Sequence, residues 1–135
     1  MKYYFDTSIW FDYFENRNDR FRPLGEWAFA LLAQIRERKD ILLISDVVLQ
    51  EFAVKFTELQ IKDLLKPFVS MLVEIAATDE QNREAGIIAR IRKLPRADAL
   101  HAVLARDNDA ILVSRDNHFG ILCDITQVRK PEDLI

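Results

Sequence analysis

Residues 41–49 read Ile-Leu-Leu-Ile-Ser-Asp-Val-Val-Leu, a continuous aliphatic run followed by two polar residues and a second apolar stretch. Four consecutive aliphatic residues are typical of a β-strand buried on both faces, as in a parallel sheet. Ser45 and Asp46 can then cap a helix that carries Val48 and Phe52 on its apolar side. This strand-then-helix unit predicts an α/β fold.

The same alternation continues in both directions from this stretch. We expect further strands at residues 2–5, 71–75, 110–113 and 125–128, and further helices at residues 7–16, 23–38, 58–66, 78–93 and 97–108. Thr78 and Gln81 have the spacing of a capping box, and Pro95 separates the last two helices. A chain of 135 residues with this order predicts a single domain, residues 1–135, with a central parallel sheet between helices.

Composition narrows the class of protein. The single cysteine, Cys123, cannot form an internal disulfide, which favours a reducing compartment, and with two histidines it is too little for a standard zinc site. No apolar stretch approaches the ~18 residues of a membrane span. We therefore expect a cytoplasmic protein with no membrane partner.

Four acids are candidates for a site: Asp6 and Asp116 follow expected strands, Asp98 lies in the first turn of its helix, and Glu51 lies about one and a half turns into the helix after residues 41–44. In open parallel sheets the active site lies beyond the carboxyl ends of the strands. We therefore expect these acids to share one crevice. Clustered carboxylates raise one another's pKa values, and a hard cation such as Mg²⁺ or Mn²⁺ removes that cost. Such ions can activate water and stabilise the leaving oxygen of a phosphodiester.

Each acid also has a simpler interpretation. Asp6 and Asp98 could be helix-cap or first-turn residues, Asp116 a turn residue, and Glu51 the partner of Lys55 at i+4. The net charge of −3 does not by itself favour a polyanionic substrate. If the four acids are set aside, the chain has 18 acids and 19 Lys and Arg, and this balance is compatible with a polyanionic substrate.

Four segments together resemble the PIN-domain ribonucleases, in particular the VapC-type toxins of bacterial and archaeal toxin–antitoxin pairs. The segments are residues 5–8 (Phe-Asp-Thr-Ser), 45–51 (Ser-Asp-Val-Val-Leu-Gln-Glu), 97–102 (Ala-Asp-Ala-Leu-His-Ala) and 112–119 (Leu-Val-Ser-Arg-Asp-Asn-His-Phe). The resemblance implies a PIN-like three-layer α/β/α fold with about five parallel strands. It also implies a Mg²⁺- or Mn²⁺-dependent endoribonuclease in which activated water leaves a 5′-phosphate and a 3′-hydroxyl.

The resemblance also assigns roles within the site. It implies that Asp6, Asp98 and Asp116 are metal-site residues, while Glu51 is either a ligand or the group that orients the water. Three neighbours are expected to support these catalytic acids: Ser8, Ser114 and Asn117. Ser114 stands where the family often has threonine. The implied partners are an RNA substrate, an antitoxin protein and a second copy of the chain in a homodimer.

Several alternatives stay open. His101 is either a substrate contact or, as we favour, a packing and hydrogen-bonding residue, and His118 is either an RNA contact or, as we favour, a surface-loop residue. Basic residues 90, 92, 93 and 96 form either a phosphate track or a solvated helix end. The rival functions are a housekeeping RNA-processing or DNA-directed PIN nuclease, a magnesium phosphatase, and a catalytically silent RNA- or protein-binding module. Ser8 argues against the phosphatase because a second acid is expected at that position.

Overall fold

The computed structural model describes residues 1–135. Its strands are β1 (Lys2–Phe5), β2 (Ile41–Ser45), β3 (Leu72–Ile75), β4 (Ile111–Val113) and β5 (Val128–Arg129). Its α-helices are α1 (Thr7–Phe14), α2 (Leu24–Glu37), α3 (Asp46–Lys55), α4 (Glu58–Leu65), α5 (Asp79–Arg92) and α6 (Arg96–Asp107). Short 3₁₀ helices cover Lys66–Phe68, Asn117–Gly120 and Pro131–Asp133.

The five strands form one parallel sheet in the order β3-β2-β1-β4-β5. The chain starts in the middle, builds outward through β2 and β3, and then crosses to the other side of β1 for β4 and β5. The strand order therefore reverses between β1 and β4. In parallel α/β sheets, a ligand-binding crevice forms beyond the carboxyl ends of the strands at such a reversal.

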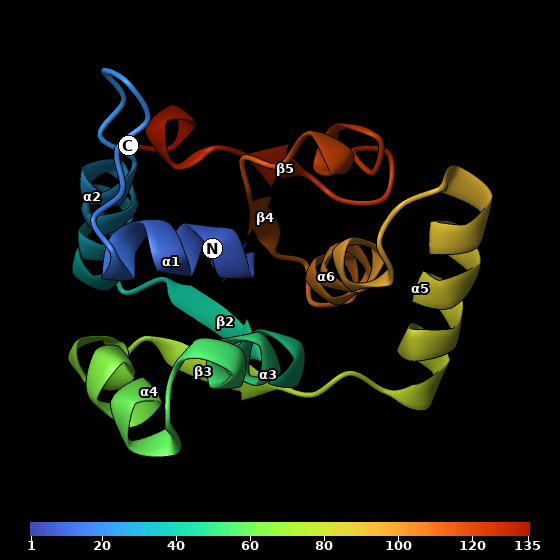
Figure 1. Ribbon diagram of the computed structural model, residues 1–135, viewed down its shortest axis with the longest axis horizontal. Coiled ribbons are helices and arrows are strands. Elements are labelled where there is room, and N and C mark those ends of the chain that lie inside the picture. The colour runs from blue at the N-terminus through green and yellow to red at the C-terminus, as the bar shows by residue number, and fades with distance from the viewer.

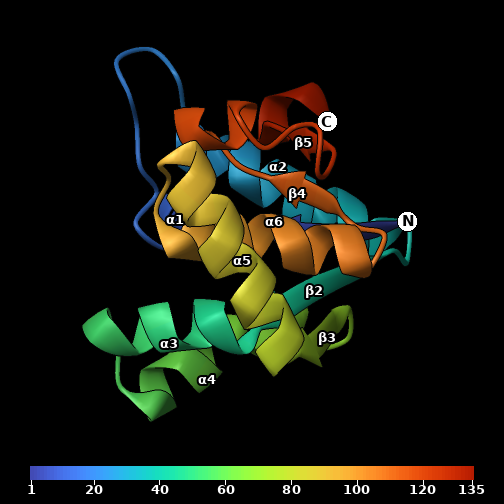
Figure 2. The same ribbon diagram turned by 90° about the vertical axis from the view of Figure 1, so that its right-hand side faces the viewer.

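Helices cover both faces of the sheet, which gives the expected three layers (Figure 1). α1 and α2 lie on one face, while α6 lies on the other with α5 packed outside it (Figure 1). Turned by a quarter, the molecule shows α5 crossing in front of α6, with α3 and α4 together at the β3 end of the sheet (Figure 2). The predicted parallel α/β/α fold is confirmed.

The core follows from the apolar runs that predict the strands. Tyr4, Leu42 and Leu112, from three neighbouring strands, are fully buried. Aromatic side chains fill the layer under α1, where Trp10 meets Phe52 edge-on, with 6.1 Å between ring centroids. Among the aromatic residues of α1, Trp10 is fully buried, whereas Phe11, Tyr13 and Phe14 are partly buried against the core. None of the six helices is long and apolar enough to cross a bilayer.

Asp6 is the N-cap of α1, in agreement with its simpler interpretation. One local prediction differs from the structure. The last strand begins at Val128, later than the predicted residues 125–128. The backbone amides of Ile125 and Thr126 donate to the carbonyl of Leu122, so this segment is a turn and is not available for strand pairing.

Gly25 lies in the first turn of α2, where two backbone segments come close together. A Cβ at Gly25 would lie 2.6 Å from the Cα of Asn16 and 2.7 Å from the carbonyl oxygen of Asp12. Contacts this short with backbone atoms leave no room for a side chain. Gly25 therefore allows α2 to start directly against the end of α1.

Candidate metal centre

Asp6 is the first acid of the site and lies where β1 ends. Its side chain caps α1 by accepting from the Ile9 amide at 3.1 Å, and it also accepts from Ser8 Oγ at 2.8 Å. Only 4% of the residue is exposed, and this burial raises the pKa of Asp6 even though the hydrogen bonds oppose the shift. The simpler interpretation of Asp6 as a helix cap is thus correct and also leaves a buried carboxylate at the strand end.

Ser114 connects Asp6 to Asp116 across the β1–β4 boundary. Its hydroxyl donates to Asp6 Oδ2 at 2.5 Å and accepts from the Asp116 amide at 3.1 Å. Ser114 follows β4 directly and is buried, with 3% of its surface exposed. One serine side chain therefore holds the ends of the two central strands together.

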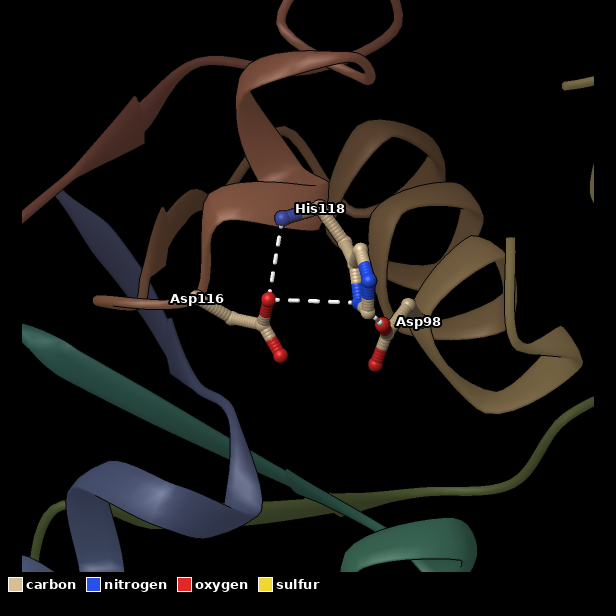
Figure 3. A group of neighbouring side chains, drawn as sticks. All are labelled: Asp98, Asp116 and His118. Carbon is tan, nitrogen blue, oxygen red and sulfur yellow. Dashed lines mark hydrogen bonds and ion pairs between the residues drawn. The ribbon is translucent and has the colours of Figure 1, made fainter. Parts of the chain in front are cut away.

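Asp98 and Asp116 face each other with His118 between them (Figure 3). His118 Nδ1 lies 2.8 Å from Asp98 Oδ2 and 3.2 Å from Asp116 Oδ1, and the His118 amide donates to Asp116 at 2.9 Å. Partial burial raises the pKa of Asp98, and the charge of Asp116 adds to the shift, while His118 opposes it. Each of the three offers one ligand atom, and these atoms lie within 4.8 Å of one another.

Glu51 projects from α3 and meets His101 on α6. His101 Nε2 lies 3.2 Å from Glu51 Oε1. Partial burial acts to raise the pKa of Glu51, but the hydrogen bond with His101 opposes this, and the pKa lies below its ordinary value. The alternative pairing with Lys55 is not formed, because the Lys55 ammonium lies 3.0 Å from a carboxylate oxygen of Glu15.

No fixed cation lies in contact with the carboxylates of the four acids. None of them has a Lys or Arg ion pair, and histidines are their only basic partners. Other acids, among them Glu84 and Glu132, do pair with arginines. Burial without a compensating fixed cation is costly for carboxylates, and oxygen ligands suit a hard divalent ion. The chemistry of this group of residues therefore fits Mg²⁺ or Mn²⁺.

Two of the three supporting residues expected from the sequence are hydrogen-bonded to an acid of the site. Ser8 and Ser114 both donate to Asp6, as described above, whereas the Asn117 side chain makes no hydrogen bond. Asn117 lines a cavity of about 280 Å³ together with Ser114, Asp116 and Arg129. Asp116 is the only one of the four acids that lines this cavity.

Two histidine contacts modify the sequence-based picture. His101 is buried and hydrogen-bonded, which confirms the favoured interpretation. His118 is exposed on the short 3₁₀ helix after β4, which agrees with its interpretation as a surface residue, and it also contacts two of the acids. Its place two residues after Asp116 was the one available signal. In the basic cluster of residues 90, 92, 93 and 96, the Arg92 guanidinium is already hydrogen-bonded to the Asp124 carboxylate.

Comparison with known protein families shows which family the chain belongs to. The family model of the PIN domain matches residues 3–124, which include all four acids. The chain belongs to the PIN-domain family. No curated protein sequence matches it.

Solved structures agree with the PIN-domain fold at low sequence identity. VapBC2 from Rickettsia felis, bound to a DNA fragment from its promoter, has a TM-score of 0.70 at 19% identity, covering 96% of this chain and 98% of that one. A toxin–antitoxin complex from Klebsiella pneumoniae has a TM-score of 0.65 at 19% identity, covering 96% and 97%. VapBC-1 from nontypeable Haemophilus influenzae has a TM-score of 0.66 at 16% identity, covering 98% and 99%. At these identities the likeness establishes the PIN fold.

Proposed function

We propose that this PIN-domain protein is a Mg²⁺- or Mn²⁺-dependent endoribonuclease. The observation that carries the proposal is that Ser114 and His118 connect Asp6, Asp116 and Asp98 beside the ends of β1 and β4, and that none of these acids has a lysine or arginine partner. A site that only bound RNA would gain from positive charge, because phosphate contacts dominate nucleic-acid affinity. A site that collects carboxylates without fixed cations is suited instead to bringing a divalent ion to a phosphodiester.

The chain's own residues divide the work of hydrolysis. Asp6, Asp98 and Asp116 would hold the ion, which when bound supplies the positive charge that acidifies water and stabilises the leaving oxygen. Ser8 and Ser114 orient Asp6 by donating to its two oxygens. Glu51 stands apart from the Asp98–Asp116–His118 group and is the carboxylate free to accept a hydrogen bond from the attacking water.

The direct test is cleavage of a labelled RNA with Mg²⁺ or Mn²⁺ by the wild type and the Asp98→Asn variant. Asp109→Asn is the matched control, because it removes the same charge from a residue that precedes β4 and so lies at the opposite edge of the sheet. Asp109 has a φ of 54°, a conformation that asparagine also adopts readily. We expect cleavage by the wild type and Asp109→Asn, loss of activity in Asp98→Asn, and no cleavage in EDTA.

Two outcomes would favour the rival functions. Cleavage of DNA in preference to RNA would support a DNA-directed nuclease. Metal-independent RNA binding with no cleavage under any divalent ion would support a silent binding module. Equal cleavage by the wild type and Asp98→Asn would overturn the site assignment itself.

We further propose that the enzyme is the toxin of a toxin–antitoxin pair and works as a homodimer. The support is the likeness to three structures that are described as VapBC or toxin–antitoxin complexes. Val54 on α3 and Leu59 on α4 are exposed aliphatic side chains of the kind that a protein partner covers. Induced expression in a bacterial host should stop growth for the wild type and not for Asp98→Asn, and light scattering should give twice the monomer mass of 15.8 kDa.

A further inference from the structure

A chain of buried hydrogen bonds leads from the sheet to Glu51. Ser45 Oγ lies 2.6 Å from Tyr4 Oη, Tyr4 Oη lies 2.6 Å from His101 Nδ1, and His101 Nε2 lies 3.2 Å from Glu51 Oε1. Tyr4 is fully buried and His101 is 2% exposed, while 40% of the Glu51 side chain is exposed. The rigid part of this chain is therefore in the core, and its last member reaches the solvent-facing site.

The direction of each hydrogen bond follows from its two ends. Ser45 Oγ accepts from the Val48 amide as the cap of α3, so the serine proton is free to be donated to Tyr4. An ionised Glu51 only accepts, so His101 Nε2 carries a proton. A neutral His101 then accepts at Nδ1 from the Tyr4 hydroxyl. The Nε2–H tautomer is the one neutral form that satisfies all three contacts.

The same helix also carries an acid of the metal centre. Asp98 and His101 are three residues apart on α6, a spacing that places them on a similar helix face. α6 therefore directs Asp98 toward Asp116 and His118, and His101 toward Glu51 on α3. The long side chain of Glu51 is half-exposed and can adopt several rotamers. The buried Nε2–H of His101 favours the rotamer in which the Glu51 carboxylate accepts its hydrogen bond.

From this geometry we infer that His101 is a positioning residue for Glu51 and that Tyr4 fixes its tautomer. The inference rests on the proposed hydrolytic function of the site. It gives Glu51 a role that the sequence leaves open: a carboxylate held by protein hydrogen bonds to receive a hydrogen bond from the attacking water, rather than a metal ligand. Loss of His101 should then impair turnover and leave metal binding intact.

A matched pair of variants separates the two nitrogen atoms of His101. The amide of asparagine reaches the position of Nδ1 and can retain the Tyr4 contact, whereas the amide of glutamine reaches the position of Nε2 and can still donate to Glu51. We expect His101→Asn to lower the single-turnover rate of RNA cleavage by about 10- to 100-fold, the usual effect of losing an outer partner of a metal-site residue. His101→Gln should recover most of the rate, and Mn²⁺ affinity should stay within about twofold of wild type in both variants.

Nitrogen NMR of the metal-free wild type tests the relay without activity. We expect His101 to show a protonated Nε2 and an unprotonated Nδ1, with the Nε2 signal shifted in Glu51→Gln and the Nδ1 signal shifted in Tyr4→Phe. A protonated Nδ1 would overturn the tautomer assignment. Equal rates for His101→Asn and wild type, or a parallel loss of Mn²⁺ affinity, would overturn the positioning role. Absence of cleavage by the wild type would overturn the proposed function instead, and the nitrogen spectra would still decide the relay.

Discussion

Replacing Ser114 by alanine removes the hydroxyl group that joins the ends of β1 and β4. The hydroxyl is buried and donates to the Asp6 carboxylate at 2.5 Å, a distance typical of a strong hydrogen bond to a charged acceptor. Such a bond contributes about 1.5–3 kcal/mol, so we expect Ser114→Ala to lower the free energy of unfolding by about 2 kcal/mol at pH 7 without metal. The Asp116 amide also loses an acceptor, but it belongs to an exposed residue that water can reach.

The pH dependence of this loss identifies its cause. The pKa of Asp6 is raised above its ordinary value of 3.8 by burial, and the Ser114 hydrogen bond opposes that shift. Without Ser114 the folded-state pKa of Asp6 is higher still. The stability difference between wild type and Ser114→Ala is therefore complete above the variant's pKa and shrinks as the pH falls through it, since a protonated Asp6 gains less from the bond.

Urea unfolding at several pH values between 4 and 8 measures this difference, with Ser114→Thr as the control that keeps the hydroxyl. We expect the threonine variant to lose no more than about 1–3 kcal/mol through its added methyl group, and this loss should be the same at every pH because the hydrogen bond to Asp6 is kept. A loss in Ser114→Ala that is the same at every pH would refute the role of the Asp6 charge. A loss below about 0.5 kcal/mol would refute the strength that we assign to the bond.

Three further predictions test the site and its scaffold. Asp6→Asn keeps a good helix cap and removes a buried charge. Because burial raises the pKa of Asp6, the stability of the metal-free wild type should fall as the pH rises through that pKa. Urea titrations of the Asp6→Asn variant should not show this fall. Mn²⁺ at 100 times its dissociation constant should stabilise the wild type by about 2.7 kcal/mol in thermal melts, and an equal gain in Asp98→Asn would count against the metal centre. Gly25→Ala should cost about 3 kcal/mol or more, because its Cβ meets backbone atoms at 2.6 Å. Gly86→Ala, whose Cβ has no neighbour within 3.4 Å, should stabilise α5 by about 0.5–1 kcal/mol, and similar urea midpoints for the two alanine variants would contradict the packing argument.

The fold was predictable where a local signal and the tertiary structure agree. Thr78 and Gln81 form the expected capping box at the start of α5. The aliphatic run from Ile41 is a buried strand, and helices alternate with strands as expected. The last strand was placed too early because Ile125, Thr126 and Val128 are residue types common in strands, although the backbone at Ile125 and Thr126 forms a turn. Hydrophobicity reports burial and does not report where the backbone amides find their acceptors.

The sequence predicted which residues form the candidate site, but it did not predict which of their side chains are in contact. Strand ends locate Asp6 and Asp116, because parallel topology brings the carboxyl ends of neighbouring strands to one edge. The His101 contact with Glu51 joins residues 50 positions apart, and the His118 contact with Asp98 joins residues 20 positions apart. No periodicity encodes such pairs, since they depend on how α6 packs against α3 and against the loop after β4.

The central place of β1 in the sheet has a consequence for biosynthesis. Asp6 is translated before the serine that orients it, which comes 108 positions later. At about 5–20 residues per second, that interval lasts about 5 to 20 s. Throughout this interval the growing chain lacks Asp116, and for most of it Asp98 is missing as well. The hydrolytic activity proposed above would therefore require a chain that extends past Asp116, and shorter nascent chains would leave the RNA of the translating ribosome intact.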